Sequence, residues 1–442
     1  MRIFLKRLHN KLGDFWWYSL MLFCACRAAD LLNAFVGLWL VPKYVAPSEL
    51  GAVQPLTQFA NFLAIPITIC AVAFMKEMTA LATRGEYGKM KSLMRGVFVG
   101  AAIFLALALV ISKLALPLFL ERIRVAEGSL GFLILAAAFT GAVAPIYQNA
   151  LQALKRFKTI SLISIVGAPM RFLAMLIAMP FRALSGYFFG QSASPAFAIV
   201  ASVWSLRKEL SVPAEPYWTR DTFRQMAKLL LGIAAYHIAG NMLGLVEQTV
   251  LRQRLPDIDS AGYYMASRFS DIAAFVACTL MTVLFPFTAS LATEGKSTRG
   301  LVVKSTLAML ATGALLALAF TVAGRPILAL LPGGDTYAEY AWAIPWLIGI
   351  TTLAAIQTFH TNTEISAGRF AFLKWWIPIN MIFAAGLLLI SGYGYFAAYL
   401  PESWCAFLAH HNFTSLSAMI AWFSLTAIAK TIASLIELLR QK

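Results

Sequence analysis

The stretch WWYSLMLFCACRAADLLNAFVGLWLV, from Trp16 to Val41, decides the class of this protein. As an α-helix it is about as long as the hydrocarbon core of a bilayer is thick, and it is mostly apolar. Arg27 and Asp30 interrupt it three residues apart, so on a helix they share a face and can form an ion pair. A charge at membrane depth costs about 3 kcal/mol on insertion scales. We therefore expect this pair to face a protein interior or a water-filled cavity.

The composition extends this interpretation to the whole chain of 442 residues. Hydrophobic residues make up 60% and charged residues only 13%, about half the charged fraction of a soluble domain. This composition indicates a polytopic membrane protein and excludes soluble enzymes. The five cysteines show no metal-binding spacing. Walker A sequences and catalytic constellations are absent, so we expect no enzyme activity, no cofactor and no metal.

Apolar segments long enough to cross a bilayer recur along the chain and predict about twelve transmembrane helices. In the N-terminal half, spans are expected near 16–41, 53–75, 96–119, 129–153, 159–181 and 185–206, the last interrupted by Gly190 and Pro195. In the C-terminal half, they are expected near 227–251, 262–288, 301–323, 339–363, 372–391 and 413–436.

Basic residues gather in every second loop between these spans. Examples are the loops that hold Lys89 and Lys91, Lys155 to Lys158, and Arg369 to Lys374. By the positive-inside rule these loops are cytoplasmic, which places both termini in the cytoplasm. The net charge of +16 is largely explained in this way, and the basic loops are positioned to meet anionic lipid.

The two halves of the chain resemble each other. ALATRGE at 80–86 matches SLATEGK at 290–296, and weaker matches follow in the same order. The longest polar break contains Pro213 and Pro216, which stop a helix. We therefore predict an all-α integral membrane protein with two pseudo-symmetric six-helix lobes around a central cavity, a transporter architecture. The predicted division is an N-terminal lobe at 1–206, a cytoplasmic linker at 207–226 and a C-terminal lobe at 227–442.

Charged side chains inside the spans are the main candidates for substrate binding. Arg268 and Asp271 repeat the spacing of Arg27 and Asp30 in the other half, and Arg171 has no acidic residue within a helical turn. Guanidinium groups stay charged and donate bidentate hydrogen bonds to phosphate. We therefore expect a cationic cavity that holds a phosphate-bearing substrate. The alternative is that each arginine is neutralised by its own aspartate and ties helices together.

The span near 227–251 carries a polar stripe formed by His237, Asn241 and Gln248. This stripe either contacts sugar hydroxyls or forms hydrogen bonds between helices. Glu247 is a candidate for coupling transport to an ion. A second polar stripe lies in the span near 339–363 and consists of Gln357, His360 and Glu364.

A first span, the short loop PSELG at 47–51, a second span and a basic amphipathic loop follow one another, and the unit repeats. This order resembles the multidrug/oligosaccharidyl-lipid/polysaccharide exporter superfamily. The chain looks most like its polysaccharide transporter (Wzx-type O-antigen flippase) branch, whose glycine-containing loop corresponds to ELGAVQ at 49–54. The resemblance implies alternating access between two lobes and a cationic cavity for an undecaprenyl-pyrophosphate-linked glycan. It also implies a multi-pass protein of the bacterial cytoplasmic (inner) membrane. Its implied partners are membrane lipids and a polysaccharide polymerase or glycosyltransferases, but no nucleic acid.

Two alternatives stay open within the superfamily. Arg27 and Asp30 are similar in kind to charges in the first helix of the lipid II flippases, so transport of a peptidoglycan precursor is the second hypothesis. About twelve spans rather than fourteen favour the polysaccharide branch. A cation-coupled drug antiporter ranks third, because acid-rich cavity helices are expected there.

Overall fold

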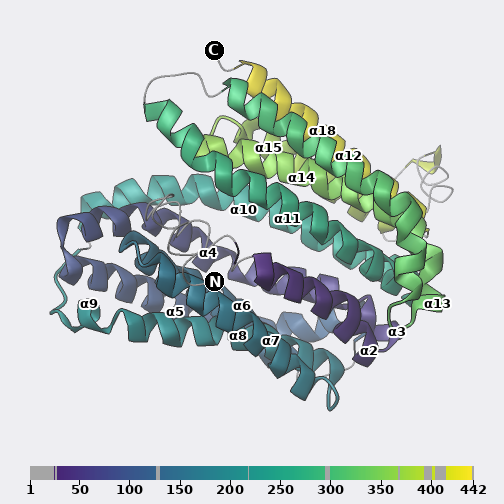
Figure 1. Ribbon diagram of the computed structural model, residues 1–442, viewed down its shortest axis with the longest axis horizontal. Helices are drawn as coiled ribbons and strands as arrows, with labels where there is room; N and C mark the ends of the chain where they lie inside the picture. The colour runs from purple at the N-terminus through teal and green to yellow at the C-terminus, as the bar shows by residue number, and fades with distance from the viewer. Residues whose placement is uncertain are drawn as a thin grey trace, which may run out of the picture. The chain divides into compact units, whose positions relative to one another are not determined.

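The computed structural model describes residues 24, 27–125, 130–217, 219–293, 299–366, 369–392, 401–403 and 415–440, in which every regular element is a helix (Figure 1). The predicted start of the first span at 16–23 and the end of the SLATEGK segment at 294–296 lie outside these residues. The long helices are α4 (Val53–Arg84), α5 (Tyr87–Arg122), α6 (Leu130–Ala153), α7 (Phe157–Ala178), α8 (Ala183–Ser205), α10 (Arg220–Arg254), α11 (Asp257–Thr293), α12 (Arg299–Ala329), α14 (Ala343–Ser366), α15 (Leu373–Ser391) and α18 (Leu416–Arg440).

Short elements connect these helices. Residues 27–35 are helical and lead into the π-helical turn η1 (Val36–Leu40). Further along lie α2 (Val41–Tyr44), α3 (Pro47–Leu50), α9 (Arg207–Ser211), α13 (Gly334–Tyr337) and the 3₁₀ turn η2 (Ala338–Trp342).

Within the described residues, nine helices are long and apolar enough to cross a membrane. They coincide with nine of the predicted spans. Of the other three, 16–41 lies partly outside the described residues, and 185–206 and 262–288 correspond to the long helices α8 and α11. The prediction of an all-α polytopic membrane protein is confirmed.

The predicted interruption of the span near 185–206 is wrong, because α8 continues through Gly190 and Pro195. Proline is tolerated in a membrane helix where neighbouring helices support the freed backbone groups. Here α7 packs along α8, and a Cβ at Gly190 would lie 2.2 Å from Cγ of Met175. Glycine at this point therefore serves the close approach of the two helices rather than a break.

The chain forms two compact units. The first unit comprises the described parts of 1–36, 63–119 and 127–234, and the second comprises those of 37–62, 120–126 and 235–442. Most of each predicted lobe falls in one unit, while two short segments, 37–62 and 120–126, group with the C-terminal half. The predicted division of the chain at 207–226 stays a prediction.

In the first unit, α6, α7 and α8 pack against one another (Figure 1). A buried apolar cluster joins them to α4 and α5 and includes Met78, Leu93 and Leu151. Tyr217 from the polar linker belongs to the same cluster, and its hydroxyl donates to Glu77 at 3.2 Å. Burial and the neighbouring Glu77 carboxylate raise the pKa of Tyr217 to about 12. The linker is thus held against the ends of α4 and α5 that the loop charges predict to be cytoplasmic.

In the second unit, α14 packs against α11, α12 and α18, and α15 packs against α18 (Figure 1). Two of the predicted polar residues on α14 join these helices. Gln357 donates to the Ala427 carbonyl at 2.8 Å and to Thr431 at 2.9 Å. His360 lies 2.9 Å from the Thr306 hydroxyl and 3.2 Å from that of Ser434. Both side chains are buried, so this part of the second stripe ties α14 to α12 and α18.

Candidate functional site

The first unit carries the ion pair that the opening stretch predicts. Arg27 Nη2 lies 3.0 Å from Asp30 Oδ2, and the two side chains are 25% and 27% exposed. The pairing of these residues on one helical face is therefore confirmed. Because the pair is not sealed within the unit, a ligand or water can approach it, which would lower the cost of charge at membrane depth.

Arg171 belongs to a helix that packs beside this pair. The Phe35 and Phe172 rings have centroids 6.1 Å apart, so the helical residues 27–35 contact α7 within the first unit. Arg171 directly precedes Phe172 on α7 and is half-buried. The first unit thus brings together the two elements that carry its three charged candidates.

The second unit carries the equivalent pair on α11. Arg268 Nη1 lies 3.2 Å from Asp271 Oδ2, and the side chains are 24% and 36% exposed. The Arg268 guanidinium also lies over the Tyr264 ring, 5.0 Å from its centroid, a cation–π contact. Both Arg-x-x-Asp sequences therefore form partly exposed ion pairs, one in each unit.

A π-helical turn makes room for Arg268. A Cβ on Gly37 in η1 would lie 2.9 Å from Cδ of Arg268, so glycine lets this side chain pass. The Tyr264 hydroxyl donates to the Gly37 carbonyl at 3.3 Å. Single π-turns of this kind frequently accompany functional sites.

Tyr263, which precedes Tyr264 on α11, interacts with three of the predicted site residues, two on α10 and one on α11. Gln248 on α10 donates to its hydroxyl at 3.2 Å. The charges of Glu247 and Arg268 both act on the same hydroxyl. The sequence places Glu247 and Gln248 in one span and Arg268 in the next, and the structure brings the two spans together around Tyr263 in the second unit.

Glu247 interacts electrostatically with Lys430 on α18. Lys430 also lies over the Trp376 ring, 5.0 Å from its centroid. The other two members of the predicted stripe remain apart from this cluster: Asn241 donates back to the His237 carbonyl at 2.9 Å, within α10. In the part of the chain that the structure describes, His237 forms no hydrogen bond from its side chain to another helix.

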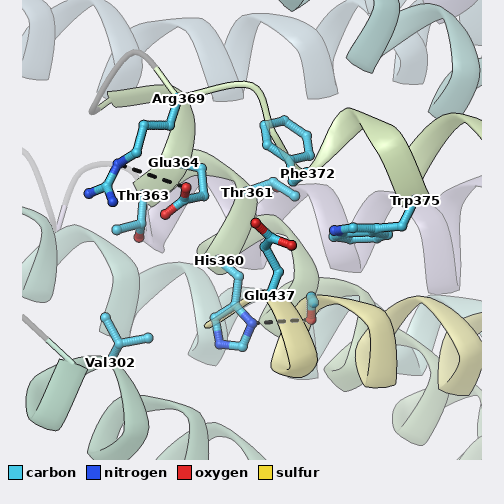
Figure 2. Close-up of a pocket in the computed structure, with 10 residues that line it drawn as sticks. Val302, His360, Thr361, Thr363, Glu364, Arg369, Phe372, Trp375 and Glu437 are labelled. Carbon is cyan, nitrogen blue, oxygen red and sulfur yellow. Dashed lines mark hydrogen bonds and ion pairs between the residues drawn. The ribbon is translucent and has the colours of Figure 1, made fainter. Parts of the chain in front are cut away.

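A small pocket with a cavity volume of about 40 Å³ lies in the second unit where α14, α15 and α18 meet (Figure 2). Two carboxylates, Glu364 and Glu437, and one guanidinium, Arg369, are among the lining side chains, and Arg369 Nε lies 3.9 Å from Glu364. This charge balance suits a small polar or cationic ligand better than a pyrophosphate. Among the described residues, no three or more His, Cys, Asp or Glu side chains are arranged so that together they could hold a metal ion. The lining includes His360, Thr361, Glu364, Arg369, Trp375 and Glu437.

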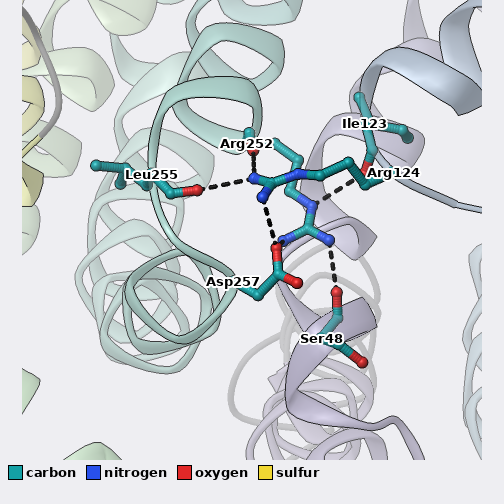
Figure 3. A network of polar contacts seen from close by, with 6 residues as sticks. All are labelled: Ser48, Ile123, Arg124, Arg252, Leu255 and Asp257. Carbon is teal, nitrogen blue, oxygen red and sulfur yellow. Dashed lines mark hydrogen bonds and ion pairs between the residues drawn. The ribbon is translucent and has the colours of Figure 1, made fainter.

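A second arginine network, which the sequence analysis missed, holds the second unit together (Figure 3). Arg252 is fully buried and donates to the Ile123 carbonyl at 3.1 Å, to Asp257 at 2.9 Å and to the Ser48 carbonyl. Arg124 adds an ion pair to Asp257 at 3.0 Å and a hydrogen bond to the Leu255 carbonyl at 2.8 Å. No signal in the sequence distinguishes Arg252 from Arg254, because both read as cations at a helix end.

No protein-family model and no curated protein sequence matches the chain. Comparison with solved structures finds the fold of the multidrug/oligosaccharidyl-lipid/polysaccharide (MOP) superfamily. A mutant of the Vibrio cholerae MATE transporter VcmN is 14% identical over 99% of this chain and 98% of that chain, with a TM-score of 0.65. The inward-facing form of a multidrug resistance MATE transporter is 12% identical over 93% of each chain, with a TM-score of 0.59.

A MOP transporter from Pyrococcus furiosus is also similar, at 13% identity over 95% of this chain and 93% of that chain, with a TM-score of 0.57. Its binding pocket is described as having reverse polarity, which suggests a different function for that protein. These likenesses confirm the predicted fold class, an all-α integral membrane protein with the fold of these neighbours. The assignment to the Wzx-type branch stays a prediction.

Proposed function

We propose that this protein is a flippase that moves an undecaprenyl-pyrophosphate-linked oligosaccharide across the bacterial cytoplasmic membrane by alternating access. The observation that carries the proposal is the pair of Arg-x-x-Asp ion pairs, one in each unit, that stay partly exposed. A sealed structural pair would be buried. Partly exposed arginines at membrane depth instead need an anion or water to compensate them.

The chemistry of the arginines fits a pyrophosphate. A guanidinium presents donors in a planar fork that matches phosphate oxygens, and it keeps its charge at any physiological pH. Asp30 and Asp271 hold Arg27 and Arg268 when no substrate is bound. When the substrate binds, its pyrophosphate replaces the aspartate as the anionic partner of each arginine. The positive charge of the arginines is therefore balanced by an anion both with and without substrate.

The uncharged polar groups suit the glycan. Gln248 and the Tyr263 hydroxyl are hydrogen-bonded to each other in the second unit, within the electrostatic reach of Arg268, and can exchange hydrogen bonds with sugar hydroxyls. His237 and Asn241 extend the polar side of α10 and complete the set of proposed substrate contacts. Glu247, which interacts electrostatically with Lys430, is the proposed site of coupling to an ion.

The similar solved structures bear on two hypotheses for the function of this fold. The reverse polarity described for the binding pocket of the Pyrococcus furiosus transporter supports the idea that the polarity of the binding pocket differs among proteins with this fold. The MATE neighbours and the carboxylates Glu364 and Glu437 around the Figure 2 pocket favour the second candidate, a cation-coupled drug antiporter. Lipid II transport remains the alternative among lipid-linked substrates, since a pyrophosphate is common to both.

Complementation of a flippase-deficient strain tests the proposal. Replacing Arg27 and Arg171 together by alanine should abolish glycan export while the folded protein remains in the membrane at normal level. Lysine at both positions should restore export only in part, because it lacks the fork. The matched control replaces the exposed Arg122 and Arg325 by alanine and should export normally.

Export at the normal rate by the double alanine variant would refute the cationic-site proposal. Parallel strains that depend on lipid II transport or on efflux of a cationic dye distinguish the alternatives. Rescue of dye efflux without rescue of glycan export would establish the antiporter instead.

A further inference from the structure

A basic pocket lies in the first unit, where the turn between α6 and α7 meets the end of α8. It has a cavity volume of about 520 Å³. Its charged and aromatic lining consists of Lys155, Arg156, Lys158, Trp204, Arg207 and Lys208. The two segments of this lining lie in loops that the alternation of basic residues predicts to be cytoplasmic. The pocket is formed within the first unit alone, and no residue of the Arg-x-x-Asp ion pairs is among its lining residues.

The charge of the basic pocket is strongly unbalanced. Five of its lining side chains are cationic, and no carboxylate is among the lining residues that the structure describes. Arg156 forms an ion pair with Glu209. The other four cations form no ion pair with any described residue. A concave surface with several uncompensated cations concentrates an anionic ligand.

The turn that builds the basic pocket is fixed by its own contacts. The guanidinium of Arg156 donates to the Ser205 carbonyl and to Glu209, which joins the α6–α7 turn to the end of α8. Lys155 has a φ of 57°, a left-handed conformation that glycine adopts more readily. A lysine stands here where glycine would fit the backbone better, which fits a role for its side chain. The cations are therefore presented on a preformed frame.

An aromatic side chain stands at the edge of the basic pocket. Trp204 is 65% exposed, and the Arg207 guanidinium lies 5.1 Å from the centroid of its ring. Tryptophan is enriched at headgroup depth, where an apolar ring meets lipid and a polar edge meets water. An exposed tryptophan beside uncompensated cations is the combination expected where a protein contacts lipid headgroups.

We propose that the basic pocket binds the phosphate of an anionic membrane lipid at the cytoplasmic surface. Lysine and arginine near an anionic surface each contribute about fivefold to binding. Lys158 and Thr159 stand in the first turn of α7, whose backbone N–H groups add a favourable field for a phosphate. The exposed Trp204 favours a lipid over free phosphate, because an apolar ring can pack against a lipid but makes no favourable contact with a soluble ion. This site is independent of the transported substrate.

Native mass spectrometry of the full chain in detergent, with phosphatidylglycerol or phosphatidylcholine added, tests the proposal. The test variant replaces Lys155, Lys158, Arg207 and Lys208 by glutamine. The charge-matched control replaces four exposed cations on the same predicted side, Arg84, Arg95, Lys304 and Lys374, by glutamine. Circular dichroism and the thermal midpoint in detergent check that both variants fold.

The wild type and the control should retain phosphatidylglycerol selectively over phosphatidylcholine, while the test variant should lose about 100-fold or more in apparent affinity. Equal retention by the folded test variant would overturn the proposal, as would an equal loss in the control. Inorganic phosphate is added in a separate arm. If it displaces phosphatidylglycerol at micromolar concentration, the pocket is a site for the free ion, and the assignment to a lipid fails.

Discussion

Arg252 and Arg268 belong to the same unit, and each forms an ion pair with an aspartate, but their burial and their other hydrogen-bond partners differ. Arg252 is fully buried and satisfies two backbone carbonyls besides Asp257 (Figure 3). Arg268 keeps 24% of its side chain exposed and pairs with Asp271 one turn along its own helix. The comparison separates an arginine that holds chain segments in place from one that can change partners.

The physical reason lies in what each guanidinium would leave behind. Removing a buried charge that carries several hydrogen bonds leaves acceptors unsatisfied in a dry interior. A partly exposed ion pair contributes little to stability, because water replaces the lost partner. Arg252 should therefore matter for folding, and Arg268 for transport.

The largest expected effect is on stability. Replacing Arg252 by alanine should lower the free energy of unfolding by about 3 to 5 kcal/mol, since the Ile123 and Ser48 carbonyls lose their donor. Unfolding by sodium dodecyl sulfate in mixed micelles measures this change. Arg254→Ala is the matched control, because Arg254 forms no ion pair or side-chain hydrogen bond with the described residues. Equal stability of the two variants would remove the distinction on which the comparison rests.

The second prediction is a large effect on export with a small effect on stability. Arg268→Ala should change the free energy of unfolding by less than about 1 kcal/mol, because the pair with Asp271 is partly exposed. Glycan export in the complementation assay should fall at least about tenfold, since a charge-assisted contact to the pyrophosphate is lost. A variant that exports normally but unfolds easily would place Arg268 in the same class as Arg252.

The sequence was sufficient for the fold class and for local pairings. Long apolar spans and the i,i+3 spacing of Arg27 with Asp30 and of Arg268 with Asp271 depend only on helix geometry, and the structure confirms these pairings. Contacts between helices were not predictable, because periodicity says which face is polar but not which helix meets it. The grouping of Gln248 and Arg268 around Tyr263 is such a contact.

The burial of Arg252 could not be predicted for a related reason. Its acceptors are backbone carbonyls at positions 48 and 123, and every residue type supplies such a carbonyl. The sequence therefore does not distinguish an exposed arginine in a loop from a buried arginine that joins several chain segments. The basic pocket was partly predictable, because its cations stand in two basic loops, but only the fold shows that these loops line one cavity.

The smallest expected effect concerns the glycine beside Arg268. In Gly37→Ala, the added Cβ would lie 2.9 Å from Cδ of Arg268, so this flexible side chain must shift by a few tenths of an ångström. Export should fall by about two- to fivefold with little change in stability, because the position of the guanidinium changes but its charge does not. Gly349→Ala is the control, since a Cβ there meets nothing within 4 Å. The double variant Gly37→Ala with Arg268→Ala sharpens the test: it should export no worse than Arg268→Ala alone, because the glycine acts through the arginine. A further loss in the double variant would show that Gly37 serves the π-turn itself.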